Sequence, residues 1–258
     1  MHNFVFENPS TLADAVAALA SEDAQALGGG QTLLPTMKQR LASPAKLVSL
    51  SGIGELGESS VSDGVVTVGA GVTHADVAGS SYGSLSVLAG NIGDPTVRNR
   101  GTIGGSLANN DPSADYPAAA LALNATINTN ARSIAADDFF QGIFTTALND
   151  GEIITSVDFR IPDASCYMKF EQPASRFALV GVYVAKYSDG VRVAITGASE
   201  DGVYRWTEAE AALNANFNAD ALDGLSVSAD GVMSDLHGTP EYRANLVKVL
   251  TARAVAEC

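Results

Sequence analysis

The stretch NIGDPTVRNRGTIGGSLANNDPSADYP, residues 91–117, combines turn-forming and polar residues more densely than any other part of the chain. Gly104 and Gly105 follow Thr102, and a polar run then leads to Asp115. Glycine allows a close approach of the backbone and a positive φ, and successive N–H groups in such a turn suit phosphate oxygens. The stretch therefore predicts a loop that holds a ligand by its backbone.

A second glycine run lies earlier in the chain, where Gly28, Gly29 and Gly30 precede Gln31 and Thr32. We expect both runs at strand ends, and two such turns favour a ligand with two phosphates. A purely structural turn is the alternative for each run. A Rossmann site would place GxGxxG between the first strand and the first helix, whereas this run comes after the first predicted helix, and no Walker A loop is present.

Composition excludes several function classes. The formal charge, 15 basic minus 29 acidic residues or −14, argues against nucleic-acid binding. The chain has no apolar run of about 18 residues that would span a bilayer, and residues 1–10 lack a secretory signal pattern, so a cytoplasmic location is expected. Cys166 and Cys258 lie far apart in sequence and form no CxxC pair, which predicts no disulfide framework and no chain-encoded metal or iron–sulfur site.

The periodicity of apolar residues predicts strand, helix, strand, loop, short helix and strand over residues 1–52. Residues 61–71 are expected to form one buried strand, residues 73–78 and 82–91 helices, and residues 117–123 a helix or buried run. Residues 153–161 form a clearer strand, in which Ile154 is expected to face away from Val157, either as a second packing layer or as a ligand platform.

A domain boundary is expected at residues 162–165. Beyond it, residues 177–187 and 191–198 predict two strands joined at Ser188–Gly190. Thr207 with Glu210 predicts a capped short helix, and Pro240 is expected to open a long terminal helix.

Several motifs in the chain are more specific than these patterns. They are GGGQTLLPTMKQRL at residues 28–41, VRNRGTIGGSLANNDPSADYPAAALAL at residues 97–123, and then DDFF, GEIITSV and KFEQPASRFALVGV. Together they resemble the FAD-binding medium subunit of the molybdenum hydroxylases, the carbon monoxide dehydrogenase and xanthine dehydrogenase type. The resemblance covers almost the whole chain.

This resemblance implies an α+β fold: a two-lobed FAD-binding domain of the vanillyl-alcohol oxidase type over residues 1–162 (lobes 1–52 and 53–162), and a C-terminal domain over residues 163–258 with a three-stranded antiparallel sheet and helices. It also implies a set of cofactor-binding residues and neither catalytic nor metal-binding ones. The cofactor-binding set is Gly28, Gly29, Gly30, Gln31, Thr32, Leu33, Thr102, Ile103, Gly104, Gly105, Ser106, Asp115, Ile154, Lys169 and Phe177.

Within this set, the family pattern assigns the two glycine runs to the pyrophosphate, Ile154 to packing on the isoalloxazine ring and Lys169 to a position near the flavin. One departure concerns Ala174–Ala178, where Arg176 replaces an acidic residue and Phe177 replaces a common tyrosine. Arg176 is therefore either a modulator of the flavin or a surface residue. Without the motif, Lys169 would read as a surface lysine.

By resemblance, the chain is the electron-transfer subunit of a heterotrimer that is expected to dimerise. A large chain would hold the molybdenum cofactor and a small chain two two-iron two-sulfur clusters, while FAD here would pass electrons to NAD, a quinone or oxygen. Two alternatives stay open: a self-sufficient flavin oxidoreductase on the same fold, and an assembly module that has lost flavin.

Overall fold

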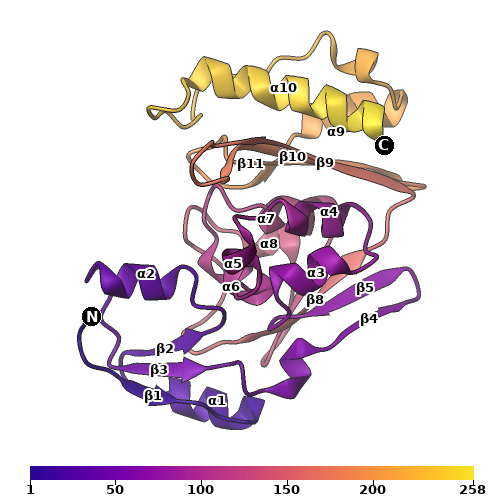
Figure 1. The fold of residues 1–258 in the computed structure, drawn as a ribbon. Helices are drawn as coiled ribbons and strands as arrows, with labels where there is room; N and C mark the ends of the chain where they lie inside the picture. The colour runs from indigo at the N-terminus through magenta and orange to yellow at the C-terminus, as the bar shows by residue number, and fades with distance from the viewer.

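The computed structural model describes all residues, 1–258, and contains three sheets with helices around them (Figure 1). The N-terminal sheet lies at one end of the molecule, a mixed layer of helices and a larger sheet lies in the middle, and a C-terminal sheet carries the last helices. This mixture of separate helices and strands confirms the expected α+β class. No helix combines the length and the apolar character that crossing a membrane requires.

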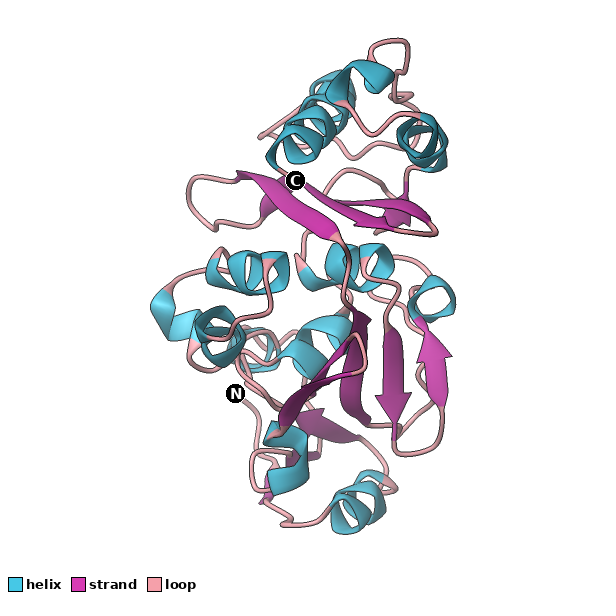
Figure 2. Ribbon diagram, turned by 90° about the vertical axis from the view of Figure 1, so that its right-hand side faces the viewer, coloured by secondary structure: helices cyan, strands magenta, loops and turns pink.

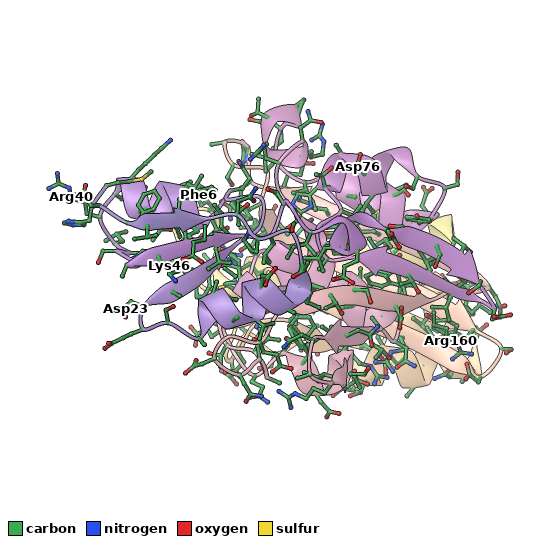
Figure 3. All side chains as sticks on the ribbon, turned by 90° about the horizontal axis from the view of Figure 1, so that it is seen from below. Phe6, Asp23, Arg40, Lys46, Asp76 and Arg160 are labelled. Atoms are coloured by element: carbon green, nitrogen blue, oxygen red, sulfur yellow. The ribbon has the colours of Figure 1, made fainter.

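The N-terminal lobe has the predicted order of elements. These are β1 (Val5–Glu7), α1 (Leu12–Leu19), β2 (Ala24–Leu27), α2 (Leu33–Lys38) and β3 (Lys46–Ser49). The strands are parallel, in the order β1-β3-β2. Thr11 caps α1 by accepting from the backbone of Asp14, as its position before an apolar-periodic segment predicts. The edge strand β1 stays exposed, and Figure 3 shows Phe6 there beside Lys46 of β3.

The middle part is built on a sheet in the order β4-β5-β8-β6-β7. Its strands are β4 (Ser59–Ser62), β5 (Val65–Gly69), β6 (Thr126–Thr129), β7 (Ser133–Ala135) and β8 (Ile154–Arg160), preceded by a 3-10 turn η1 (Gly54–Gly57). The prediction of one strand over residues 61–71 is wrong. Asp63 and Gly64 both have positive φ and turn the chain into a β4–β5 hairpin.

The helices of this part are short and mostly small-residue. They are α3 (His74–Gly79), α4 (Ser84–Gly90), α5 (Pro95–Arg98), α6 (Ile103–Asn109), α7 (Tyr116–Ala122) and α8 (Ala136–Phe139). The sequence left open whether residues 117–123 form a helix or a buried apolar run. Residues 117–122 belong to the helix α7, and all seven residues of α7 are buried. Residues 91–117 are thus not one loop: they contain the short helices α5 and α6, the turns around them and the first two residues of α7.

The expected orientation of Ile154 is wrong, and a β-bulge is the reason. On β6, Asn128 pairs with Ser156 but Thr129 pairs with Ile154, so Thr155 is an extra residue on β8. An extra residue reverses the alternation of side chains beyond it. Ile154 therefore points into the same core as Val157 and is 5% exposed.

The C-terminal sheet has four strands, not the three expected, in the order β12-β11-β10-β9. They are β9 (Ala164–Glu171), β10 (Ala178–Tyr187), β11 (Gly190–Thr196) and the two-residue β12 (Tyr204–Arg205). Helices α9 (Thr207–Ala215) and α10 (Pro240–Glu257) cover one face, with η2 (Ala219–Leu222) beside α10. Helices α4 and α7 cover the other face, so the sheet lies between two helical layers (Figure 2).

The start of α9 differs from the prediction. Thr207 does not cap this helix: Trp206 is the N-cap residue, and the Glu210 carboxylate accepts from the backbone N–H of Val193 at 2.9 Å. Arg160, at the end of β8, pairs with Asp189 in the β10–β11 turn at 2.9 Å and joins the middle sheet to the C-terminal one. Figure 3 places Arg160 at the opposite end of the molecule from Arg40.

Candidate functional site

The first glycine turn presents unused hydrogen-bond donors. It follows the end of β2, as expected, and precedes α2. The backbone N–H groups from Gly28 to Leu33 donate no hydrogen bond within the chain, and the hydroxyl of Thr32 has no partner either. A run of free N–H groups at a half-exposed turn is the arrangement that binds phosphate oxygens.

The second glycine turn differs from the first. It lies in the first turn of α6 and not at a strand end, with Thr102 as the N-cap. The N–H of Ile103 donates to Val72 at 3.1 Å and that of Gly104 to Ala70 at 2.9 Å. These two amides therefore hold α6 on the protein, and they are not free to bind phosphate oxygens as the N–H groups of this turn were expected to be.

What the second turn leaves available is a small polar surface. Gly105 is exposed, and its N–H makes only a 3.2 Å bond to the Thr102 hydroxyl. The Ser106 hydroxyl has no hydrogen-bond partner within the chain. A ligand that reached this turn would therefore meet the Gly105 amide and the Ser106 hydroxyl.

The two turns pack directly against each other. A Cβ on Gly29 would lie 1.9 Å from the carbonyl oxygen of Arg100, and one on Gly28 would lie 2.9 Å from the hydroxyl of Thr102. A Cβ on Gly104 would lie 2.6 Å from Ala70. The glycines at these positions are therefore required by chain-to-chain approach. The close approach of a ligand to the same turns stays a prediction.

Asp115 lies at the start of α7 with its carboxylate buried, 4% exposed. It accepts from the hydroxyl of Tyr167 and pairs with Lys169, whose Nζ lies 3.0 Å from Oδ1. Lys169 also donates to the carbonyl of Asn91 at 2.9 Å and is 2% exposed along its side chain, so it is not a surface lysine. Burial raises the pKa of Asp115, and Lys169 and Tyr167 act against that rise.

A glycine on the neighbouring strand makes this contact possible. Gly181 of β10 pairs with Lys169 of β9, and a Cβ on Gly181 would lie 2.6 Å from the Tyr167 hydroxyl. The Tyr167 ring therefore occupies the space that a larger residue at 181 would take, and from there its hydroxyl reaches Asp115. Sequence reasoning missed both Tyr167 and Gly181, because nothing in the local pattern of β9 or β10 relates them to Asp115.

The remaining predicted residues lie around these groups. Ile154 lies in the main core on β8. The backbone carbonyl of the next residue, Thr155, accepts from the N–H of Ala70, and the carbonyl of Ala70 accepts in turn from the N–H of Gly104. Phe177 is 46% exposed in the β9–β10 turn. Arg176, also in this turn, has a φ of 59° and reaches the carbonyl of Gly93 at 3.5 Å.

Two buried polar groups beneath the second turn have no partner. Nδ1 of His74 and the hydroxyl of Tyr116 are both buried and unbonded, and the two rings lie 5.3 Å apart. The His74 ring fills the space beside Gly101, where a Cβ would lie 2.5 Å from Nε2. Burial, together with the charge of Arg98, lowers the pKa of His74 to about 4, so the ring is neutral. His74 is the first residue of α3, in the helix expected over residues 73–78.

Comparison with known proteins gives a consistent result. The family model described as the FAD binding domain in molybdopterin dehydrogenase matches residues 2–164. The chain belongs to this family of FAD-binding proteins. The nicotine 6-hydroxylase medium subunit of Paenarthrobacter nicotinovorans is 34% identical over 98% of this chain and 96% of its own length. The carbon monoxide dehydrogenase medium chain of Afipia carboxidovorans is 31% identical, again over 98% of this chain and 96% of its own length.

Solved structures agree with these relatives. Quinoline 2-oxidoreductase from Pseudomonas putida 86 superimposes with a TM-score of 0.89 at 30% identity, covering 99% of this chain and 96% of that one. Reconstituted carbon monoxide dehydrogenase from Oligotropha carboxidovorans gives the same TM-score and identity, covering 99% and 97%. The FAD-binding chain is therefore an oxidoreductase subunit of the molybdenum hydroxylase type.

The groups described above fit FAD. The free amides from Gly28 to Leu33 suit a diphosphate, which two closely packed turns can hold between them. Such amides are needed here because the overall charge of the FAD-binding chain is −14 and offers no general attraction for phosphate.

Proposed function

We propose that this chain carries FAD as the electron-transfer subunit of a molybdenum-containing hydroxylase, taking electrons from iron–sulfur clusters on a partner chain and passing them to an external acceptor. FAD, when bound, supplies the conversion of one-electron deliveries into two-electron output. The observation that carries the proposal is the run of unpartnered amides from Gly28 to Leu33 packed against the second glycine turn.

The first turn would bind the diphosphate by its backbone N–H groups and the Thr32 hydroxyl. Gly105 and Ser106 would add contacts from the second turn, and Thr102 would position that turn by capping α6. Because Ile103 and Gly104 already donate to the protein, they would act by holding the turn in place and not by binding the ligand.

Lys169 would place a fixed positive charge near the flavin, and Asp115 and Tyr167 would hold that charge in position. A nearby cation favours the reduced, anionic form of the ring. Ile154 and Phe177 would pack against the ring system, Ile154 from the core and Phe177 from the exposed β9–β10 turn.

The proposal extends to the assembly. Medium chains of carbon monoxide dehydrogenase and of nicotine 6-hydroxylase are named as parts of larger complexes. We infer a large partner that holds the molybdenum cofactor and a small partner with two two-iron two-sulfur clusters, arranged as a dimer of heterotrimers. We also propose the vanillyl-alcohol oxidase type of fold for residues 1–162, with lobes 1–52 and 53–162, and a separate C-terminal domain over residues 163–258.

The test is to purify the chain alone and in the complex that it forms in its own cells. We expect the isolated chain to bind FAD but to turn over neither carbon monoxide, purines nor aldehydes, and we expect the complex to oxidise one substrate and reduce an acceptor. Turnover by the isolated chain would instead support a self-sufficient flavin enzyme. A folded chain that ignores added FAD would support a flavin-free assembly module.

A further inference from the structure

The backbone directly before α7 is held by the C-terminal sheet. Residues 112–114 lie between α6 and α7, outside any helix or strand. Thr196 is the last residue of β11, and its hydroxyl oxygen lies 2.7 Å from the carbonyl oxygen of Ala114 and 3.0 Å from that of Pro112. The backbone N–H of Gly197 donates to the Pro112 carbonyl at 2.8 Å. These contacts join the segment to the end of β11.

The Ala114 carbonyl depends on the Thr196 hydroxyl. Thr196 is 1% exposed and Ala114 is 8% exposed, so the contact lies in the interior. A hydroxyl has one hydrogen to donate, and the Pro112 carbonyl also accepts from Gly197, whereas the Ala114 carbonyl has no other donor within the chain. This carbonyl belongs to the peptide bond that joins Ala114 to Asp115. The hydroxyl therefore fixes the orientation of the peptide from which Asp115 extends.

Thr196 lies in one row across the C-terminal sheet with the lysine that pairs with Asp115. Gly181 of β10 pairs with Thr196 on one side and with Lys169 on the other, and residues opposite each other in a sheet share a face. A Cβ on Gly181 would lie 2.8 Å from the Thr196 methyl group and 2.6 Å from the Tyr167 hydroxyl. The sheet thus contacts Asp115 at its carboxylate, through Lys169 and Tyr167, and at its preceding peptide, through Thr196.

Asp115 has no local hydrogen bond that would fix its side chain. It is the N-cap residue of α7, but its φ of −80° and ψ of −45° are helical, and its side chain caps no backbone N–H. An N-cap aspartate ordinarily has an extended backbone and accepts from the first turn of its helix. Here the carboxylate is directed at Tyr167 and Lys169 instead. Its position therefore depends on the contacts with the C-terminal sheet.

We propose that Thr196 is a positioning residue, whose hydroxyl fixes the peptide before Asp115 and so keeps the Asp115 carboxylate on Lys169. The inference rests on the proposed function, because a flavin close to this ion pair is what would respond to its geometry. Without the hydroxyl, the Ala114 carbonyl is left buried and unpaired, which is costly enough to displace the segment. The displaced carboxylate then opposes the charge of Lys169 less effectively.

The test compares Thr196→Val, which replaces the hydroxyl by a methyl group, with Thr196→Ser, which keeps the hydroxyl. Spectroelectrochemical titration of the FAD-loaded full chain should show a higher flavin reduction potential in Thr196→Val, shifted in the same direction as in Asp115→Asn but by less. Thr196→Ser should keep the wild-type potential. An unchanged potential in Thr196→Val would overturn the proposal, and so would an equal shift in Thr196→Ser, which would assign the effect to the methyl group beside Gly181.

Thr251→Val is the matched control for the loss of a buried hydroxyl. Thr251 lies on α10, is fully buried, and donates its hydroxyl to the Val247 carbonyl at 2.7 Å. No contact of this hydroxyl reaches the segment before α7. The control should therefore leave the potential at the wild-type value, and a shift equal to that of Thr196→Val would overturn the positioning role.

A second measurement needs no flavin and separates this proposal from the proposed function. Urea unfolding compares Thr196→Val, Asp115→Asn and the double variant. Residues of one hydrogen-bonded network are energetically coupled, so the loss of stability in the double variant should be smaller than the sum of the single losses. Additive losses would overturn the positioning role. Coupled losses in a chain that binds no FAD would support that role while refuting the proposed function.

Discussion

Lys169 and Asp115 form a buried ion pair. In the proposed position of this pair near the flavin, the two charges have opposite effects on the flavin reduction potential. Lys169→Met removes the cation and should lower the flavin reduction potential, whereas Asp115→Asn leaves the cation unopposed and should raise it. For a two-electron couple, an interaction of about 1.4 kcal/mol corresponds to about 30 mV, so shifts of roughly that size are expected. Spectroelectrochemical titration of the FAD-loaded chain measures them, and shifts in the same direction would contradict an electrostatic role.

The same pair contributes to stability. Removing one partner leaves an uncompensated buried charge, which typically costs about 3–5 kcal/mol. We expect Lys169→Met to lower the free energy of unfolding by an amount of that order, and Lys169→Met with Asp115→Asn to recover part of it. Urea unfolding of the three proteins measures this. Equal losses in the single and the double variant would mean that the two side chains do not act as a pair.

His74 predicts a pH dependence of stability. Its pKa in the folded protein is about 4, below the ordinary value of 6.5, so the unfolded chain binds the proton more readily between these values. Stability is therefore complete above about pH 6.5 and falls as the pH falls toward 4, by about 3 kcal/mol. Urea unfolding at pH 7.5 and 4.5 should show this loss in the wild type and a smaller one in His74→Gln. Equal losses in both proteins would remove His74 as the cause.

At the scale of elements, the first glycine turn makes the sharpest prediction. In Gly29→Ala the new methyl group would lie 1.9 Å from the Arg100 carbonyl, so the two turns must separate. We expect the dissociation constant for FAD to rise at least about tenfold, which corresponds to about 1.4 kcal/mol. Fluorescence titration of the chain with FAD measures it.

Gly54→Ala is the matched control, because a Cβ on Gly54 meets nothing within 4 Å. It should leave FAD binding within about 0.5 kcal/mol of the wild type, as is usual for surface substitutions. If Gly29→Ala bound FAD as well as Gly54→Ala, the close packing of the two turns would not matter for the ligand.

The elements show where sequence reasoning succeeds. Locally encoded features were predicted correctly, for example the order of elements in residues 1–52, the cap at Thr11 and the helix over residues 73–78. Features that depend on pairing with a distant strand were not. The bulge at Thr155, which reverses Ile154, exists only relative to β6, and no property of residues 153–161 alone reveals it.

The candidate site divides in the same way. The two glycine turns, Asp115 and Lys169 were found from their motifs, and their roles toward FAD stay predictions. The difference between a turn with free amides and a turn with used amides was not found, because it depends on Val72 and Ala70 accepting from Ile103 and Gly104. Partners far apart in sequence decide which donors remain for a ligand.

For the whole molecule, the proposed FAD contacts all come from this one chain. FAD should therefore stabilise the isolated chain, by about 2.7 kcal/mol when its concentration is 100 times the dissociation constant. That corresponds to a rise in unfolding temperature of roughly 5–10 °C for a chain of this size. FMN, which has one phosphate and no diphosphate, is the matched control and should give a much smaller rise. Equal rises with both would argue against a diphosphate site between the turns.

The missing side chain of Gly181 leaves the space that the Tyr167 ring occupies. Gly181 itself lies in the middle of β10, a largely buried and apolar strand. A mutational survey guided by distance from the cofactor would pass over this position. Yet a single added carbon at 181 would displace the phenol and leave the Asp115 carboxylate without one of its two hydrogen-bonding neighbours. Under the proposed role of Asp115 near the flavin, such a variant would register in assays as a flavin defect. Variants that pair a larger residue at 181 with a smaller one at 167 are therefore the combination to look for when the subunit is redesigned.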